Sequence, residues 1–379
     1  MIGTGLVVSA TLGCCWVFGS GRAWAQVEEP ADPGVEVQGG LELSASAAAS
    51  AARPRRQHAE LVEENDVGLF SPLGSDTDED YTQGGMVAAS VEAPELFDVL
   101  PGLGERLSFG AGSFDRAAFG VQGRHLIFTP TEIDIFEPIE DDRPFAGVIL
   151  LGAHVQRRND RVLDHAELLV GAIGDISGAE NAQSQLHQSL SFRPVNGWDN
   201  QVDDRFLVQA GLRRDWRRRR SFDGSVYDGR GWAWDVIGSV GQDLGNLQIV
   251  SRADATVRIG RRLADDFGPS RVGVLGAQVQ ADRPERGEGE SLLASWGFAA
   301  FSRVGVRYVA MDITLDGHGD RAPSVNPREW YAEVAYGFEW SPADHFRVTW
   351  QDTYRTETFV EKRGLHRFAS VGLFFDFTF

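Results

Sequence analysis

The chain has 379 residues and a formal net charge of −19, and 42% of its residues are hydrophobic and 24% charged. These proportions exclude wholesale disorder, and the acidic excess argues against a nucleic-acid-binding protein. Beyond the N-terminus no apolar run reaches about 18 residues, which excludes transmembrane helices. Transmembrane β-barrels stay open, because their strands alternate and have an average composition.

The first 25 residues are typical of a secretory signal peptide. An apolar stretch is followed by Ala23 and Ala25, which fit the small-residue cleavage pattern, although no Lys or Arg precedes the stretch. Cys14 and Cys15 lie in this segment, so we expect the mature chain to have no disulfide and no thiolate metal site. Residues 26–57 are acidic and then rich in Ala and Ser, which predicts a flexible leader.

From residue 58 to residue 379, apolar and polar residues alternate in runs that turn residues separate. This pattern predicts an all-β fold, a twelve-stranded antiparallel transmembrane β-barrel with a short helix in an extracellular loop. The expected strands are 58–68, 81–92, 119–129, 143–157, 160–174, 204–216, 230–243, 247–260, 291–315, 326–341, 344–359 and 365–379.

Aromatic residues favour the membrane barrel over its alternative, a soluble β-sandwich or barrel. One apolar face carries Trp330 and Trp340 at its two ends, as expected for aromatic girdles at two membrane interfaces. The last expected strand ends at Phe379, which resembles the signal by which the barrel-assembly machinery recognises outer-membrane barrels.

With both termini in the periplasm, several polar segments are expected at the external end, among them Glu63–Asp66, Asp78–Thr82 and Asp141–Gly147. The turns 93–118 and 261–290 are expected in the periplasm, where their length is unusual and unexplained. We expect Asp265 and Asp266 to lie in a solvated turn. The basic run Arg213–Arg220 is expected to contact inner-leaflet headgroups, with Trp216 at the interface.

The loop 175–203, between the fifth and sixth strands, contains the one predicted helix. Ser177 and Glu180 fit a capping box, with the serine as N-cap. Gln183 and His187 are four residues apart and therefore neighbours on one face. Beside a rim of carboxylates, this histidine can act as a general base near neutral pH. An apolar stripe against the barrel wall is expected from Ala179, Ala182, Leu186 and Leu190.

Short motifs in this order resemble those of the outer-membrane lipid A 3'-O-deacylase family, over essentially all of residues 58–379. They are Asn65-Asp66, the Thr-Asp-(x)n-Tyr-Thr-x-Gly run at Thr77–Gly84, Phe128-Thr129-Pro130, Asp142–Gly147, Gln183-(x)3-His187, Gly197–Gln201, Leu315-Asp316-Gly317 and Thr356-Glu357-(x)-Phe359.

The resemblance implies an outer-membrane enzyme that hydrolyses the ester of the 3'-linked acyloxyacyl chain of lipid A, with lipopolysaccharide of the outer leaflet as its partner. It implies that His187 activates a water molecule and that a Ca²⁺ forms the oxyanion hole. Asn65, Asp66 and Thr82 fall in the implied metal and oxyanion region, and Gln183 belongs to the same motif as the histidine. Ca²⁺ prefers such oxygen ligands.

Two positions depart from the family pattern. Some members have an active-site lysine before the Asp-Arg motif, but the only lysine here is Lys362, so that role is vacant or falls to an arginine such as Arg143. Some members also have a glutamate six residues after the histidine, where this chain has Arg193.

Two other functions stay open. An outer-membrane phospholipase with a serine nucleophile would use His187 and Ser189, although residues two apart diverge on a helix and Leu190-Ser191-Phe192 replaces the expected Asn-Gly-Arg. A pore or adhesin-like barrel would use its rim carboxylates for structural Ca²⁺ or for solubility.

Overall fold

The computed structural model describes residues 55–66, 79–93, 113–273, 276–277, 296–317, 322–343 and 345–378. The predicted signal peptide, nearly all of the predicted leader and Phe379 lie outside the described residues. In the described part of the chain, no helix is long and apolar enough to cross a membrane.

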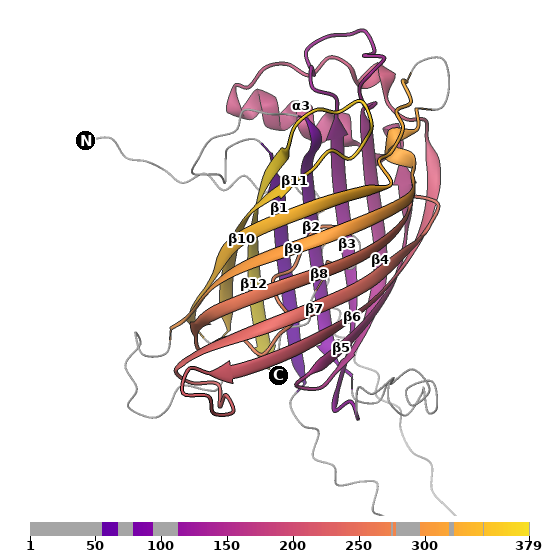
Figure 1. Cartoon of the computed structure of the whole chain (residues 1–379). Coiled ribbons are helices and arrows are strands. Elements are labelled where there is room, and N and C mark those ends of the chain that lie inside the picture. The colour runs from indigo at the N-terminus through magenta and orange to yellow at the C-terminus, as the bar shows by residue number, and fades with distance from the viewer. Residues whose placement is uncertain are drawn as a thin grey trace, which may run out of the picture. The chain divides into compact units, whose positions relative to one another are not determined.

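Twelve antiparallel strands form a closed barrel, in which β1 pairs with β12 and every other pair is consecutive in sequence (Figure 1). This arrangement confirms the predicted fold. The strands are β1 (Arg56–Asn65), β2 (Asp80–Glu92), β3 (Arg116–Thr129), β4 (Ala146–Arg158), β5 (Val162–Ile173), β6 (Arg205–Ser221), β7 (Trp232–Gly245), β8 (Gln248–Arg261), β9 (Gly297–Asp312), β10 (Trp330–Ala343), β11 (Phe346–Arg355) and β12 (His366–Thr378).

Some boundaries differ from those expected. The segment expected as one strand at 291–315 contains β9 followed by a short 3-10 turn, η4 (Ile313–Leu315). β6 continues to Ser221, beyond the expected end at residue 216, and β11 ends at Arg355, before the expected end at residue 359.

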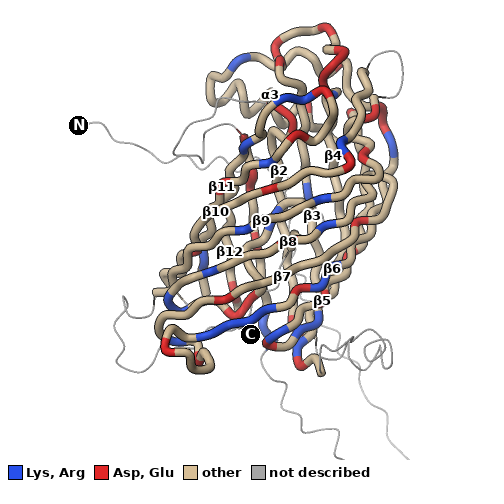
Figure 2. The backbone as a smooth tube through the Cα atoms, in the orientation of Figure 1, with Lys and Arg blue, Asp and Glu red and all other residues tan. Residues whose placement is uncertain are grey.

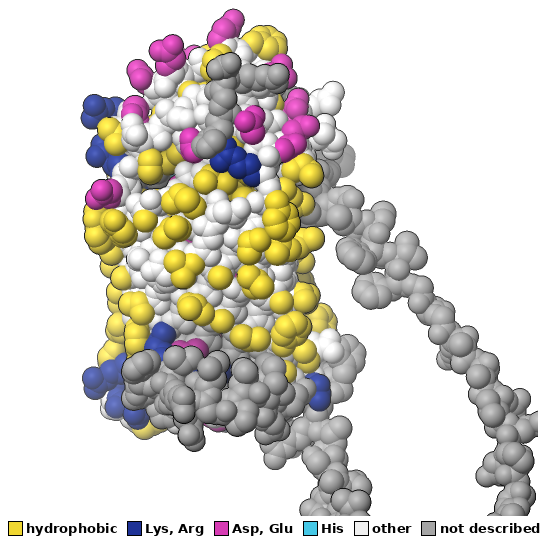
Figure 3. All heavy atoms as spheres, turned by 90° about the vertical axis from the view of Figure 1, so that its right-hand side faces the viewer, with side chains coloured by type: hydrophobic (Ala, Val, Ile, Leu, Met, Phe, Trp, Pro, Cys, Tyr) yellow, Lys and Arg dark blue, Asp and Glu magenta, His cyan; other side chains and the backbone are white. Residues whose placement is uncertain are grey.

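Apolar side chains form a band on the outer surface, and charged side chains collect above and below it (Figure 3). On β10 the exposed residues include Trp330, Phe338 and Trp340, whereas Glu333 and Glu339 on the opposite face are buried in the lumen. This apolar-out, polar-in alternation is the pattern of a barrel that spans a membrane.

The two ends of the barrel differ. β1 begins beside the end of β12, because Arg56 pairs with Thr378, and the helix α3 (Ala179–Leu190) lies at the opposite end (Figure 1). Acidic residues are frequent in the connections around α3 (Figure 2). We call the α3 end the outer end and the other the periplasmic end, since both termini of such barrels are periplasmic.

A segment after β8 folds back into the lumen. We call residues 262–273 and 276–277 the plug. Within it the Ser270 hydroxyl donates to the Glu60 carboxylate of β1, and the Val272 N–H donates to Glu64 Oε1 at 3.3 Å. Gln156 of β4 donates to the carbonyl oxygen of Ala277 at 3.2 Å. The plug is therefore part of the long turn 261–290, whose length had no explanation in the sequence analysis.

Asp266 of the plug is fully buried between Arg258 of β8 and Arg347 of β11, and it is ion-paired with both. Burial by itself would raise the pKa of this carboxyl, but the two guanidinium groups outweigh that effect and hold the pKa below its ordinary value. The expectation of a solvated turn at Asp265 and Asp266 is therefore wrong. The two carboxylates neutralise arginines in the barrel interior instead of facing water.

The basic run on β6 is divided between the two faces of the strand. Arg217 and Arg219 turn inward, where Arg217 pairs with Asp265 and Arg219 Nε lies 3.3 Å from Asp235. Trp216 is exposed on the outer surface. The expected headgroup contact is wrong for the inward-facing arginines, since period-two alternation directs every second side chain to the lumen.

We expect Asp266→Ala to lower the free energy of unfolding by about 3 kcal/mol, because it leaves two buried guanidinium groups undercompensated. The value lies at the low end of the range for broken buried pairs, since Asp235 and Glu339 still contact these arginines. Urea unfolding in detergent measures the effect. Asp223→Ala, in an exposed turn, is the matched control and should leave the midpoint unchanged. Equal midpoints for the two variants would contradict this account of the plug.

Candidate active site

Polar residues replace apolar ones on the outward face of β1 near its outer end. Leu61 is 37% exposed on this face, and Asn65 follows it four residues later. Asn65 and Asp66 are buried, and Asn65 Oδ1 has no hydrogen-bond partner among the residues that the structure describes. The Asp66 N–H donates to the carbonyl oxygen of Thr82 at 3.1 Å, and Asp66 Oδ2 accepts from the Glu79 N–H at 2.8 Å. These bonds tie the end of β1 to the start of β2.

A β-bulge in β2 places Thr82 beside Asn65 and Asp66. Tyr81 pairs with Phe128 and Gln83 pairs with Ile127, so Thr82 is one extra residue in β2 with no partner on β3. Such a bulge reverses which side of the sheet the following residues face, and bulges commonly redirect side chains near active sites.

The side chains show this reversal. Just before the bulge in sequence, Tyr81 points into the lumen and donates from its hydroxyl to Glu64 Oε2 at 2.8 Å. Beyond it, Gln83 belongs to the outward face, because it pairs with Asn65 on β1. The Thr82 and Thr129 hydroxyl oxygens lie 2.6 Å apart. Thr129 belongs to the Phe128-Thr129-Pro130 motif of the family resemblance, but no role was expected for it.

The helix α3 packs on the outward face of β3 and β4. At Gly147 of β4, an added Cβ would lie 2.1 Å from Ser177 Oγ and 2.3 Å from the Ala179 Cβ, so only glycine allows the helix to approach this closely. An apolar cluster joins the helix to the wall; its members are Ile127, Ile133, Phe145, Ala179 and Trp198.

The start of α3 differs from the prediction. Gly178, in the left-handed conformation with φ of 69°, is the N-cap, whereas Ser177 ends a preceding 3-10 turn, η2 (Asp175–Ser177), and accepts from the Ala179 N–H through Oγ at 3.3 Å. The predicted capping box is therefore wrong, because the turn at Gly178 starts the helix one residue later than the predicted N-cap would.

The buried face of α3 is Ala179, Gln183 and His187, whereas Leu190 is 39% exposed. The predicted apolar stripe is thus wrong at its C-terminal end, and the polar pair faces the barrel instead. Ala179 lies over Gly147 on β4, and the helix also contacts β3, so it leads toward β2 (Figure 1). His187 lies about 12 Å along the helix from Ala179, which corresponds to about two and a half strand spacings.

Both polar side chains are held by the chain that follows the helix. Trp198, in the 3-10 turn η3 (Trp198–Asn200), donates from Nε1 to Gln183 Oε1 at 3.0 Å. His187 Nδ1 lies 2.8 Å from the carbonyl oxygen of Arg193. Because a carbonyl can only accept, Nδ1 carries the hydrogen, and a neutral His187 has its lone pair on Nε2. Arg193 stands where some family members have a glutamate, and its backbone carbonyl oxygen orients His187.

Two residues of the sequence hypotheses lie elsewhere. Arg143 points into the lumen, where it pairs with Asp80, donates to Thr314 Oγ1 at 2.9 Å and lies 4.4 Å from the centre of the Phe128 ring. The structure does not bring it to Asn65, Asp66 and Thr82, which we call the outward group. Ser189 is exposed and donates its hydroxyl to the carbonyl oxygen of Gln185 at 2.7 Å.

The outward group offers oxygen ligands for a hard cation. Its oxygens come from the Asp66 carboxylate, the Asn65 amide and the Thr82 hydroxyl, and the Asn65 oxygen is buried without a hydrogen bond from the described residues. No cluster of three or more His, Cys, Asp or Glu side chains suited to a metal occurs in the described ranges. A bound cation would therefore also use hydroxyl, amide, carbonyl or water oxygens, which suits Ca²⁺ and fits the residues present.

Comparisons with known proteins agree with this architecture. A family model described as outer membrane protein LpxR matches residues 39–377. The solved structure of LpxR from Salmonella typhimurium superposes with a TM-score of 0.65 at 15% identity, over 84% of this chain and 99% of that chain.

Other solved barrels are less similar, and no curated protein sequence matches the chain. The β domain of the Bordetella autotransporter BrkA gives a TM-score of 0.37 at 8% identity, over 86% of this chain and 99% of that one. The translocator domain of NalP from Neisseria meningitidis gives 0.32 at 8% identity, over 88% and 91%. TM-scores this low do not bear on function.

We expect Gly147→Ala to loosen α3, because the new methyl group would overlap Ser177 and Ala179 and overpacking costs about 1–3 kcal/mol. Amide hydrogen exchange within α3 should become about tenfold faster. The control is Gly238→Ala on β7, where an added Cβ meets no atom within 4 Å. Unchanged exchange in Gly147→Ala would contradict the close seating of the helix.

Proposed function

Because the chain belongs to the family of the outer membrane protein LpxR, we propose that this outer-membrane barrel is a lipid A 3'-O-deacylase. The reaction is hydrolysis of the ester that carries the 3'-linked acyloxyacyl chain of lipid A. The proposal includes lipopolysaccharide of the outer leaflet as the substrate and recognition of the C-terminal strand by the barrel-assembly machinery.

One observation carries the proposal: the candidate residues are on the outward side of the barrel wall. Asn65 follows Leu61 on the lipid-facing side of β1, and Gln183 and His187 lie on the buried face of α3, which packs on the outward side of the wall. A lipid in the outer leaflet can reach this side by lateral diffusion. A substrate dissolved in water would instead favour a site in the lumen or at its mouth.

In the proposed mechanism His187 is the general base. With Nδ1–H fixed on the carbonyl oxygen of Arg193, Nε2 accepts a proton from the water that attacks the ester carbon. Attack by water forms no acyl-enzyme, so no nucleophilic side chain is needed. Gln183, fixed by Trp198, is placed to orient the water or the ester through its amide.

The oxyanion region is formed by Asn65, Asp66 and Thr82. These residues would hold a Ca²⁺, whose charge would stabilise the negative oxygen of the tetrahedral intermediate. The Thr82–Thr129 hydroxyl pair fixes one of the oxygens, and the bond between Asp66 and the Glu79 N–H fixes another.

The structure disfavours both alternatives. The exposed Ser189 hydroxyl is bonded to its own helix backbone, which is a poor arrangement for a serine nucleophile. The plug, bonded to β1, β4, β8 and β11, fills part of the lumen and is unfavourable for an open pore.

We expect His187→Ala to reduce lipid A deacylation by about 10²–10⁴-fold, because general-base assistance typically contributes that much. Ser189→Ala on the same helix is the matched control and should keep most of the activity. The measurement is mass spectrometry of lipid A treated with each folded variant. A dead Ser189→Ala, or labelling of Ser189 by a fluorophosphonate, would replace this mechanism with that of a serine phospholipase.

We expect Asp66→Ala to raise the Ca²⁺ concentration needed for activity at least tenfold, or to abolish activity, because it removes the only carboxylate of the proposed ligand set. Titration of deacylation against free Ca²⁺ measures this effect. Asp203→Ala, at an exposed site between η3 and β6, should behave like the wild type. Full wild-type activity in excess chelator would rule out a role for the cation.

A further inference from the structure

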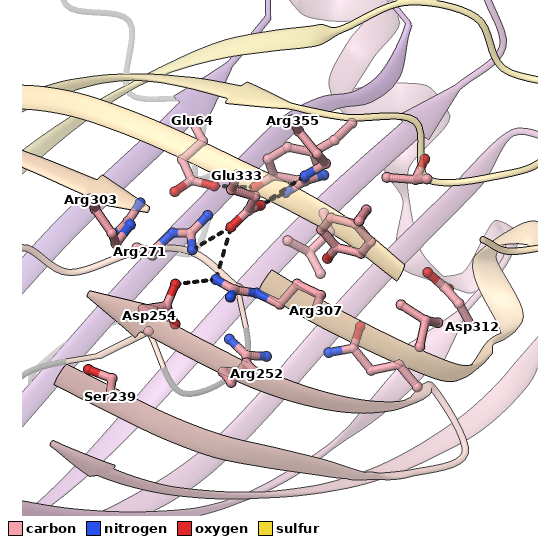
Figure 4. Close-up of a pocket in the computed structure, with 18 of the residues that line it drawn as sticks. Glu64, Ser239, Arg252, Asp254, Arg271, Arg303, Arg307, Asp312, Glu333 and Arg355 are labelled. Atoms are coloured by element: carbon pink, nitrogen blue, oxygen red, sulfur yellow. Dashed lines mark hydrogen bonds and ion pairs between the residues drawn. The ribbon is translucent and has the colours of Figure 1, made fainter. Parts of the chain in front are cut away.

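A cavity of about 170 Å³ lies in the lumen, between the plug and strands β8 to β11, and we call it the lumenal cavity (Figure 4). It includes none of Asn65, Thr82, Gln183 and His187. One side of it is rich in arginine, with Arg252, Arg271, Arg303, Arg307 and Arg355. The proposed deacylation gives these residues no role.

The carboxylates on this side are already shared among most of the arginines. Glu333 accepts from Arg271 at 3.0 Å, from Arg307 at 2.9 Å and from Arg355 at 2.9 Å. Asp254 accepts from Arg307 at 2.8 Å. A single carboxylate with three guanidinium partners leaves an excess of positive charge around it.

The other carboxylates near these arginines do not balance the remaining positive charge. Arg252 forms its own ion pair with Asp243. Glu64 lines the cavity, but its two oxygens accept from the Tyr81 hydroxyl at 2.8 Å and from the Val272 N–H at 3.3 Å. Over the whole lining, seven arginines face six carboxylates. Two of these arginines, Arg143 and Arg213, are paired with Asp80 and Asp215.

Arg303 of β9 differs from the other four arginines on this side, because it forms no ion pair with a described residue. It is only 7% exposed, and its one hydrogen bond to a described residue is a long one, 3.5 Å from Nη2 to Gln351 Oε1. No ion pair joins it to any carboxylate in the described part of the chain, and no dashed line reaches it in Figure 4. A buried guanidinium without a direct ion pair is costly, because burial removes its hydration.

Arg303 lies near Arg271 of the plug, which repels it, and also near Asp254 and Glu333, which attract it without forming an ion pair. Arg303 belongs to the barrel wall and Arg271 to the plug. An anion between them would neutralise Arg303 and turn the repulsion into a link between wall and plug.

We propose that the lumenal cavity binds a small tetrahedral oxyanion of the phosphate or sulfate kind, held by Arg303 and Arg271. Guanidinium groups bind such oxyanions through paired N–H donors, which favours them over a halide. The space suffices for one such ion with a few water molecules, since a water occupies about 30 Å³.

The test is equilibrium dialysis of the purified mature barrel against radiolabelled inorganic phosphate, without Ca²⁺. The wild type should bind one phosphate, and Arg303→Gln should bind it at least tenfold more weakly, because a hydrogen-bonded charge pair is lost. Arg218→Gln, an exposed arginine of β6, is the matched control and should bind like the wild type. Heat-modifiable mobility on a gel verifies that each variant is folded.

His187→Ala separates this site from the outward site, where lipid phosphates could bind. It should keep the wild-type affinity for phosphate. Loss of binding in His187→Ala but not in Arg303→Gln would place the phosphate at the outward site and overturn the proposal. Equal binding by Arg303→Gln and the wild type, or no binding by the wild type, would also overturn it.

A second measurement covers the case in which Arg303→Gln does not fold. The thermal midpoint of the wild type should rise with phosphate relative to chloride at equal ionic strength, because an anion that binds the native barrel stabilises it. Arg303→Lys, which keeps the charge but loses the paired donors, should show a smaller rise. No difference between phosphate and chloride would refute an oxyanion site.

Discussion

The pairing of β1 with β12 is the constraint on which the rest of the structure depends. Inside a membrane a strand edge has no water to bond with, so a sheet must close on itself. Here Arg56–Asn65 pairs along its whole length with Ala369–Thr378, which removes the last edge. Closure also creates the two surfaces that matter for function, an outward face in contact with lipid and a lumen sealed from it.

Each surface has its own kind of polar group. In the lumen, charged side chains neutralise one another in clusters such as Arg258, Asp266 and Arg347. On the outward face, the outer ends of β1, β2 and β3 carry a separate set of polar residues, where α3 covers part of the wall. The bulge at Thr82 separates the two, because it lets Tyr81 serve the lumen while Gln83, two residues later, faces outward.

The strands and their number could be predicted because period-two alternation is a direct consequence of a wall with lipid on one side and polar side chains on the other. The helix could also be predicted, from the spacing around Gln183 and His187. Its start could not, since the left-handed turn at Gly178 depends on the close contact with Gly147, which lies far away in sequence.

The lumen was the least predictable part. Asp265 and Asp266 look like any acidic turn until the partner arginines of β6, β8 and β11 are placed around them. The run Arg213–Arg220 looks like a headgroup-binding patch until the alternation of β6 divides it between two faces. The bulge at Thr82 has no sequence signal either, because one extra residue in a strand leaves the composition unchanged. The alternation of apolar and polar residues therefore predicts the strands of the barrel wall, but it does not predict the plug and the ion pairs inside the lumen.

The connections of the plug also bear on how the barrel is assembled. Ser270 bonds to Glu60 on the first strand and Asp266 pairs with Arg347 on the eleventh, so the segment after β8 joins strands from the two ends of the chain. These contacts need strands that come before and after the segment in the chain, so they are complete only when β1 and β11 are both in place. The buried charges of the lumen therefore stabilise only a barrel in which the two ends of the chain have come together.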